Sequence, residues 1–569
     1  MASTFSKHGS SNEIPGLNEP DNKQPTHNLE SQDVKKEPAG PGWTSLPHKD
    51  QLAILFLCRL VDFLQVASLQ AYAFFQLKAL DSTLSDSEIS NQSGILQGAF
   101  TGAQVLTAFL WGKAADASWC GRKRALLIGL FGTAISCLGY GFTMSFSWAV
   151  LWRAAGGGVN GTVGVTRTMI AEITVEKKHQ SRAFLILPIS FSVANILGPL
   201  MGGLLANPAM ILPCLFEEGA IWSFDWITEY PYALPSVINA VALTLTGLIV
   251  FFALEETLNE RKGKRDAGLY LASRIKSLFF RKLPGESGYY KLQPWRVPDG
   301  PAEYMEENDE QPIHEISEPK RKGRTLPFRR VWTRNVIFTL ITEAFYDFQL
   351  GAFTNIWTLF LSTPRSSPSQ TTHRSLPWTF TGGLGMPAST VGVATSILGV
   401  LGIILQIFLY PLVHARLGTL RGSRWFLPLF PIAYFLTPYL AVIPSSSEPS
   451  QPASGPAIWI YMTLIQFLQV TARTITLPAS IILLNNCSPH PSVLGLVHGL
   501  GQSVSASFRT IGPIVGGWWY GSGLEMGVVG WSWWAVAFVS ALGCASAMFI
   551  YEGSGHEILL EGEEDEDRL

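Results

Sequence analysis

Charged residues are scarce in this chain. Only 15% of the 569 residues are charged and 47% are apolar, whereas soluble domains carry about 25% charged residues. Of the six cysteines only Cys214 falls in a segment expected outside the cell, and none of the ten histidines forms a ligand-spaced cluster. A disulfide framework and a metal site are therefore not expected. No nucleotide-binding loop or nucleophile motif is visible, so no cofactor is expected and an enzyme is disfavoured.

Long apolar runs are what the sequence has instead of charge. A membrane-spanning helix needs about 20 mostly apolar residues, and such runs predict twelve spans, six on each side of residue 300. The predicted spans are 52–72, 93–112, 125–146, 148–171, 183–205, 234–254, 335–361, 388–413, 425–443, 457–484, 495–521 and 530–551. The expected fold class is an all-α membrane protein of two pseudo-symmetric six-helix halves.

Five regions follow from this pattern. The two halves are expected at 51–254 and 335–551, joined by a polar cytosolic linker at 255–334. The linker is expected to be a tether, with one short amphipathic helix near 269–280. Residues 1–50 are predicted to be a disordered cytosolic tail without a cleavable signal peptide, and 552–569 an acidic cytosolic tail.

The Lys and Arg residues are sorted between the loops. The loops expected inside hold 27 of them, whereas the outer loops hold only Lys78, Arg365 and Arg374. This asymmetry predicts that both termini are cytosolic. The same sorting, with a net charge of −2, argues against a nucleic-acid partner. A monomer in the lipid bilayer is expected, and neither tail decides between the plasma membrane and the vacuolar membrane.

A short phrase is repeated in the two halves, as GPLMGG and GPIVGG. The first copy contains Gly198, Pro199, Gly202 and Gly203, and the second contains Gly512, Pro513, Gly516 and Gly517. Glycines let neighbouring helices approach closely and a proline kinks its helix. The duplication predicts two related halves, which in many carriers rock against each other around a central site.

Charged residues inside the predicted spans are the strongest functional signal, because a charge in the membrane is costly unless it serves a pathway or a partner. Arg59 and Asp62 share a face of the first span and could form an ion pair. Gln65 and Tyr72 continue that face and could border a substrate pathway. A pair that only orients the helix is the alternative.

The seventh predicted span carries a second candidate site. Glu343 and Asp347 lie one helical turn apart, near mid-depth of the membrane, with Asn355 on the same stripe. Two carboxyls this close in a low dielectric cannot both be ionised at low cost. One of them is therefore a candidate for taking up and releasing a proton, and the alternative is a lining that binds a cationic substrate.

Several stretches resemble the major facilitator superfamily, and within it the twelve-helix drug:proton antiporters, most closely a fungal branch similar to the plant zinc-induced facilitator-like proteins. The matching stretches are GKAADASWCGRKR, WRAAGGGVNG, RTMIAEITVEKKHQSRAF, NILGPLMGG and NNCSPHPSVLGLVHGLGQSVSASFRTIGPIVGG. The resemblance implies a secondary active transporter that works by alternating access and exports a small organic compound or drug in exchange for protons. It gives no reason to expect zinc as the substrate, since the histidines are not clustered.

The resemblance also implies roles for particular residues. Proton coupling is implied for Arg153, with Arg473 as its approximate counterpart in the second half, and an antiporter-type motif is implied by the first proline–glycine phrase. Arg167, Glu172 and Arg182 are expected to form ion pairs of an inner gate. A cytosolic gating loop is implied by Gly112, Asp116, Gly121, Arg122 and Lys123.

Two other functions remain open at this point. A proton-coupled importer or facilitator of a small nutrient would use the same scaffold, and dissipating the gradient would then collapse substrate accumulation. A membrane sensor that binds without transporting is the second alternative. Deletion of 262–325 separates it from a carrier, because a carrier should keep transport whereas a sensor should lose its signal.

Overall fold

The computed structural model describes residues 47–174, 183–184, 186–211, 213–216, 225–258, 260–261, 266–279, 326–366, 375–448, 451–553 and 556–558. Within these ranges the regular structure is helical, apart from an isolated bridge between Ser375 and Thr379. Most of the predicted tails and of the predicted linker lie outside the described residues. The boundaries of the five predicted regions therefore stay predictions.

The first half is built from long helices joined by short segments. They are α1 (Lys49–Leu80), α2 (Asp86–Asp116), α3 (Arg122–Gly141), α4 (Phe146–Val159), α5 (Thr162–Ile173), α7 (Ile186–Leu205) and α11 (Ala233–Ala253), with the short α8 (Pro208–Ile211), α9 (Pro213–Phe216) and α10 (Asp225–Glu229) before α11. The short helix expected near 269–280 is present as α12 (Ala267–Phe279).

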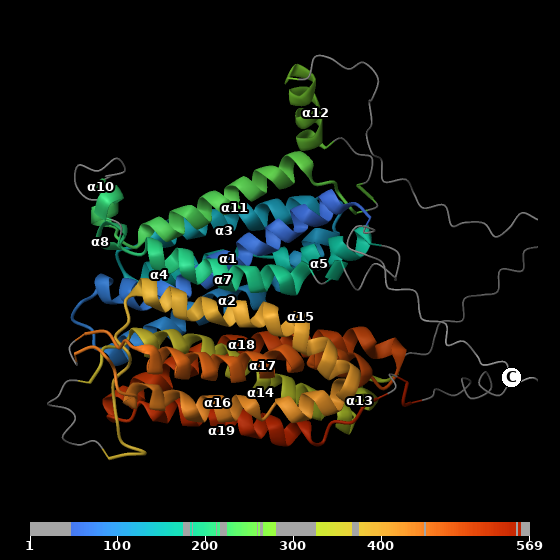
Figure 1. Ribbon diagram of the computed structural model, residues 1–569. Helices are drawn as coiled ribbons and strands as arrows, with labels where there is room; N and C mark the ends of the chain where they lie inside the picture. Colours follow the sequence, from blue (N-terminus) through green and yellow to red (C-terminus); the bar gives the residue numbers. More distant parts are fainter. Residues whose placement is uncertain are drawn as a thin grey trace, which may run out of the picture. The chain divides into compact units, whose positions relative to one another are not determined.

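The second half follows the same plan. After α13 (Phe328–Val331) come α14 (Arg334–Ser362), α15 (Ala388–Phe426), α16 (Leu429–Leu436), η3 (Thr437–Val442), α17 (Pro456–Asn486), η4 (Pro491–Val493), α18 (Leu494–Glu525) and α19 (Gly530–Ala547). In Figure 1 the blue-to-green helices and the yellow-to-red helices form two groups, with α7 beside α15 where the groups meet.

The helix bundle has a linker end and an opposite end. At the linker end α11 finishes at Ala253 and α14 begins at Arg334, and at the opposite end lie α8 and α10 (Figure 1). Local capping fixes several helix starts. Ser85 and Glu88 form a reciprocal capping box at the start of α2, and the Thr333 hydroxyl accepts a hydrogen bond from the Val336 N–H at the start of α14.

Seven segments of the described chain are long and apolar enough to cross a membrane, judged by length and composition. They are Lys49–Leu80, Arg122–Gly141, Ile186–Leu205, Ala233–Ala253, Arg334–Ser362, Ala388–Val442 and Pro456–Asn486. One of these segments, Ala388–Val442, covers two predicted spans, 388–413 and 425–443. Gly418, whose backbone is non-helical with φ 67°, separates them. That left-handed conformation suits glycine, since it has no Cβ. Twelve crossings remain a prediction.

The repeated proline–glycine phrases occupy equivalent positions in the two halves. Gly198 and Gly202 pack against α1, the first helix of their own half, and Gly512 and Gly516 pack against α14, the first helix of theirs. The last glycine of each phrase faces the opposite half instead. Gly203 lies against Ala388 of α15, and Gly517 lies against Ser90 of α2.

The prolines of the two phrases extend this symmetry. The carbonyl oxygen of Pro199 lies against Gly392 of α15, and that of Pro513 lies against Gly94 of α2. Each phrase therefore joins the first helix of its own half to the second helix of the other half. The contacts support close packing between halves as the common role of both copies.

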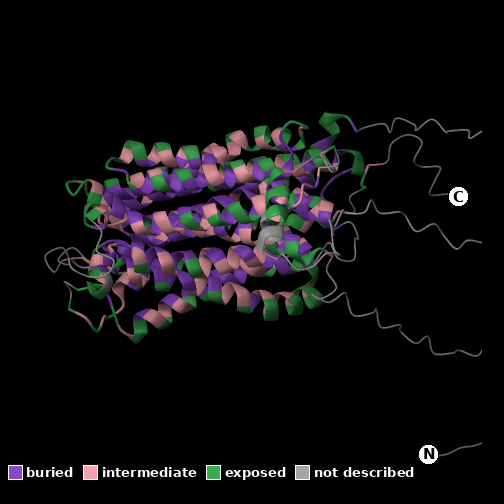
Figure 2. Cartoon of the chain, turned by 90° about the horizontal axis from the view of Figure 1, so that it is seen from above, coloured by how far each residue is buried: buried purple, intermediate pink, exposed green. Residues whose placement is uncertain are grey.

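Two large apolar clusters form the core. One joins α1, α3, α5, α7 and α11 of the first half. The other centres on tilted and edge-to-face aromatic rings of α14, α16 and α19, such as Phe353 and Trp533, and it also takes in Phe74, Leu77 and Ile89 of the first half. Figure 2 shows the buried residues between the helices. The halves therefore meet along the glycine contacts and through apolar residues of α1 and α2 that join the second cluster.

Replacing Gly203 or Gly517 by alanine is expected to destabilise the protein. A Cβ at either position would press on a backbone carbonyl oxygen of the opposite half, which lies 2.5 Å from the ideal Cβ in the case of Gly517. Overpacking of this kind costs about 1–3 kcal/mol, so the melting temperature in detergent should fall. Gly164→Ala is the matched control, because no atom lies within 4 Å of its Cβ position. Equal melting temperatures for all three variants would contradict the packing role.

Candidate functional site

An ion pair lies in the interior of the first half. The Arg59 guanidinium donates to the Asp62 carboxylate, and both side chains are buried. The other Asp62 oxygen accepts from the Asn160 side-chain amide, and the Thr162 hydroxyl donates to Asp62 over 2.8 Å. A buried ion pair is stable only when further hydrogen bonds satisfy its remaining groups. Asn160 and Thr162 supply those bonds.

The helix break that positions Asn160 and Thr162 lies between α4 and α5. The span predicted over 148–171 is interrupted here, since α4 ends at Val159 and α5 begins at Thr162. A single crossing over these residues stays a prediction. The preceding glycines let α2 approach, where the Trp111 indole donates to the Gly158 carbonyl over 2.8 Å. The Asn160 side chain bonds Asp62 instead of continuing the helix.

The remaining predicted pathway residues of the first half are also buried. The Arg153 guanidinium donates to the Gln65 side chain over 3.1 Å and lies over the ring of Phe100, with 4.5 Å between the guanidinium carbon and the ring centroid. The Tyr72 hydroxyl lies 3.0 Å from the hydroxyl of Ser236. Among the described residues Arg153 has no carboxylate partner, so Gln65 and an aromatic face accommodate its charge.

The carboxyls of the second half lie in different environments. The Asp347 carboxylate accepts from Arg509 of α18 over 2.8 Å; its side chain is 4% exposed, whereas that of Arg509 is 55% exposed. Glu343, one turn earlier, is buried, and its Oε2 atom has no hydrogen-bond partner among the described residues. Asp347 is therefore engaged in an ion pair, whereas Glu343 is a buried carboxyl with a free oxygen.

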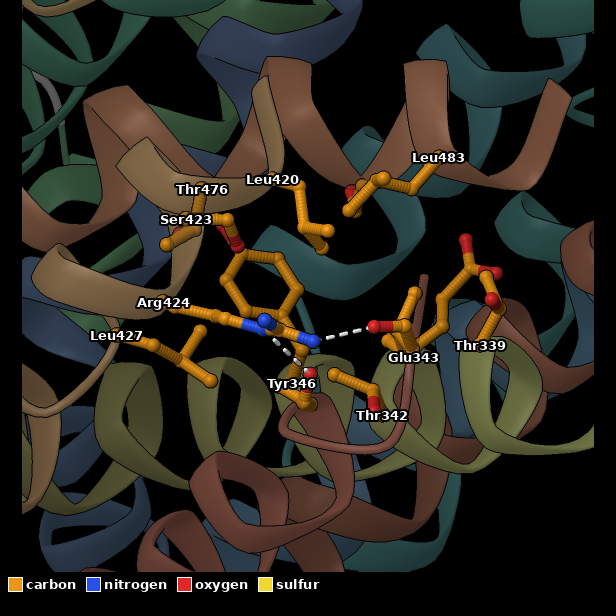
Figure 3. A pocket seen from close by; sticks show the side chains of 13 residues that line it. Thr339, Thr342, Glu343, Tyr346, Leu420, Ser423, Arg424, Leu427, Thr476 and Leu483 are labelled. Carbon is orange, nitrogen blue, oxygen red and sulfur yellow. Dashed lines mark hydrogen bonds between the residues drawn. The ribbon is translucent and has the colours of Figure 1, made fainter. Parts of the chain in front are cut away.

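A cavity borders Glu343 at the linker end of the second half. It has a volume of about 30 Å³ and lies between α14, α15, α17 and α19. Figure 3 shows Glu343 and Arg424 on opposite sides of it. The Arg424 guanidinium donates to the carbonyl oxygens of Ala547, Met548 and Ile550 at the end of α19. Its charge is thus satisfied there, and Glu343 stays unpaired.

Asn355 connects the two halves. Its side-chain oxygen accepts from Ser93 over 2.9 Å and from Gln97 over 3.0 Å, both on α2, and its amide nitrogen donates to the Pro513 carbonyl over 3.0 Å. Asn355 therefore holds the interface at the second proline–glycine phrase, and a substrate role for it stays a prediction.

Exposed polar side chains on both halves indicate a crevice between them toward the linker end. Arg167 lies on α5, and Gln502, Ser503 and Ser507 form an exposed polar face of α18. Polar side chains exposed at this depth line water and not lipid. The contacts between halves described above, together with the hydrogen bond from Ser87 to Glu525, lie toward the opposite end.

The predicted gating loop organises the linker end of the first half. Arg122 donates to Asp116 and, over 3.1 Å, to Glu172, while Lys123 donates to Asp266 over 2.7 Å. Within the described residues these bonds join the first half to itself and, through Asp266, to the start of the linker. Gly121 has φ 81° at the start of α3, and Gly112 is exposed with open space around it. Of the expected inner-gate residues, Arg182 lies outside the described residues, and Arg167 has no ion-pair partner in the part of the chain that the structure describes.

Reasoning from the sequence missed three residues of these clusters. Arg509 carries the same signal as the other candidates, a charge within a predicted span, and could have been found. Asn160 and Thr162 could not, because their role depends on a helix break that no proline marks. The two intramembrane ion pairs seen in the structure lie in different halves, Arg59–Asp62 in the first and Asp347–Arg509 in the second.

Comparisons with known proteins agree with this architecture. The model of the Major Facilitator Superfamily matches residues 55–373. The Major facilitator superfamily multidrug transporter mfsB of Aspergillus fumigatus is 33% identical over 534 residues, covering 90% of this chain and 84% of that protein. Protein ZINC INDUCED FACILITATOR 1 of Arabidopsis thaliana is 23% identical over 468 residues, covering 81% and 82%.

A solved structure shows the same fold. The D-xylose-proton symporter superposes with a TM-score of 0.57 at 13% identity, covering 89% of this chain and 99% of that one. The resemblance inferred from the sequence is thereby confirmed. This chain belongs to the major facilitator superfamily, and it is an integral, multi-pass membrane transporter and not an enzyme.

Proposed function

We propose that this transporter exports a small organic compound in exchange for protons, by alternating access at the crevice between its halves. The observation that carries the proposal is the Glu343 carboxyl, buried in α14 with an oxygen that lacks a partner, one turn from the Asp347–Arg509 pair. An unpaired buried carboxyl can exchange a proton when the crevice changes its exposure. The multidrug transporter relative supports export of an organic molecule.

The two halves supply the moving parts. Most of each apolar cluster lies within one half, and the halves meet along the glycine contacts and at Phe74, Leu77 and Ile89. A rocking motion can exchange these contacts while the rest of each cluster stays packed. Arg509 sits on α18 and bonds Asp347 on α14, so a displacement of α18 would alter the charge beside Glu343. We propose that this coupling links proton uptake to the opening of the crevice, with Asp62 and Arg153 as further members of the coupling network.

A growth screen tests the direction of transport. A strain lacking the gene should become hypersensitive to one class of compound in a broad panel of toxic molecules, and it should retain more of that compound than the parent strain does. Resistance of the deletion strain, with reduced uptake of the compound, would instead indicate an importer.

The topology proposed here has twelve crossings, cytosolic termini and a monomeric chain in the plasma or vacuolar membrane. It predicts that Cys214, the exposed cysteine before α10, and the linker face opposite sides. In sealed membranes a membrane-impermeant maleimide should label either Cys214 or a cysteine placed in the linker by Ser287→Cys in a Cys214→Ser background, and both only after permeabilisation. Labelling of both positions in sealed membranes would contradict the proposed topology.

A further inference from the structure

We infer that the crevice binds an organic anion, a small molecule that carries a carboxylate, sulfonate or phosphate group. The inference rests on the proposed function and names its substrate class. Two guanidinium groups carry it, Arg167 of α5 and Arg473 of α17, neither of which has a carboxylate partner among the described residues.

Arg167 projects from the first half toward charges of both halves. It is exposed, has no hydrogen-bond or ion-pair partner among the described residues, and lies within electrostatic reach of Arg59 in its own half and Arg509 in the other. Like charges brought together in this way repel one another. An arrangement of this kind is unfavourable when empty and is relieved when an anion enters.

Arg473 occupies a related position on the other side. Its guanidinium carbon lies 4.6 Å from the ring centroid of Phe191 on α7, so it also reaches across from one half to the other. Asp347 and Arg509 are within its electrostatic reach, but the carboxylate of Asp347 is bonded to Arg509. Within the part of the chain that the structure describes, Arg473 thus has no ion pair of its own.

The carboxyls at this depth do not compensate these two cations. Asp62 is bonded to Arg59, Asn160 and Thr162, and Asp347 is bonded to Arg509. The Oε2 atom of Glu343 lies 3.2 Å from the position that a Cβ atom would take at Gly501. It donates to or accepts from neither arginine. The described crevice therefore holds a surplus of positive charge whether Glu343 is protonated or ionised.

The chemistry of the lining fits an aromatic or otherwise planar anion. A guanidinium binds a carboxylate, sulfonate or phosphate through two parallel hydrogen bonds, and it retains this ability while stacked on a ring. The exposed amide of Gln502 on α18 offers a neutral hydrogen-bond donor, whereas the hydroxyls of Ser503 and Ser507 donate to backbone carbonyls of their own helix. A permanent cation would meet two unpaired guanidiniums and is expected to be excluded.

Binding of two xanthene dyes of similar size tests the inference on the purified full-length protein. Fluorescein, an anion, and rhodamine 123, a cation, are titrated against it by fluorescence anisotropy at low and high salt. Fluorescein should bind saturably and more tightly than rhodamine 123, and salt should weaken its binding. The double variant Arg167→Gln/Arg473→Gln should lose at least about tenfold in fluorescein affinity, which corresponds to about 1.4 kcal/mol.

The matched control is Arg421→Gln, which removes one exposed positive charge beyond the Gly418 break. It should bind fluorescein as the unmodified protein does, and the melting temperatures of all variants establish that they are folded. Equal or tighter binding of rhodamine 123, absence of saturable fluorescein binding, or an unchanged affinity in the double variant would overturn the inference. Vesicle transport of bound fluorescein is measured separately, so an anion that binds but is not moved would reject the proposed export and leave the site intact.

Discussion

Replacement of Glu343 by glutamine is expected to abolish proton-driven transport while leaving substrate binding within a few-fold of its original affinity. Glutamine has nearly the same shape as glutamic acid but cannot release a proton, and the Oε2 atom that it alters bonds no other described residue. The measurement is transport of the screened compound in reconstituted vesicles with and without an imposed pH gradient. The Glu343→Gln variant should transport the compound at the same rate with and without the pH gradient.

The control for this variant is Glu552→Gln, the same exchange at an exposed position after α19, which should keep the full response to the gradient. Asp347→Asn provides a comparison, because it leaves the Arg509 guanidinium without its carboxylate and should weaken both coupling and binding. A pH response in Glu343→Gln as large as in the unmodified protein would remove Glu343 from the proton pathway and leave Asp347 and Asp62 as the remaining carboxyls.

Replacement of Asp62 by alanine is expected to cost most of the folded protein. The substitution leaves the buried Arg59 without its counter-charge and removes the acceptor of Asn160 and Thr162. Removing one partner of a buried ion pair costs about 3–5 kcal/mol, which is a large share of the stability of a typical domain. The yield of monodisperse protein and its melting temperature should both fall sharply.

A double substitution shows whether the loss of stability comes from the unpaired charge of Arg59. In Arg59→Met/Asp62→Leu both charges are gone, and apolar replacement of a buried pair is often neutral or stabilising. The double variant should recover much of the lost stability but not transport. Asp225→Ala, at an exposed carboxylate at the start of α10, is the control. Normal melting of Asp62→Ala would show that the pair contributes little to the fold.

The family and the layout of the helices could be predicted from the sequence because they depend on long apolar runs and on a repeated phrase. The glycines of GPLMGG and GPIVGG predicted close helix contacts. In the structure the first two glycines of each phrase contact their own half, and the last glycine contacts the opposite half. Residues such as Arg59 and Asp62 could be paired because they lie three apart on one helix, which fixes their separation.

Contacts between distant helices could not be predicted in this way. The pairing of Asp347 with Arg509 depends on the packing of α14 against α18, and the bonds from Asn160 and Thr162 depend on the break between α4 and α5. The unpaired state of Arg167 was also invisible, because the sequence cannot show that Glu172 bonds Arg122 instead. Such pairings are set by tertiary packing and not by spacing along the chain.

The most direct test of alternating access is a distance measurement between spin labels on the two halves. Gly164→Cys in α5 and Gly499→Cys in α18 lie at the linker end, where neither added side chain meets an atom within 4 Å. Met210→Cys and Met526→Cys, both at exposed positions, report on the opposite end. The labelled pairs are measured at low and high pH and with substrate, in a background without Cys214.

We expect two populations of the distance between the labels in each pair. Conditions that shorten the linker-end distance should lengthen the distance at the opposite end, and Glu343→Gln should hold both pairs in one population at every pH. A single distance at each end that neither pH nor substrate changes would contradict the rocking of the two halves.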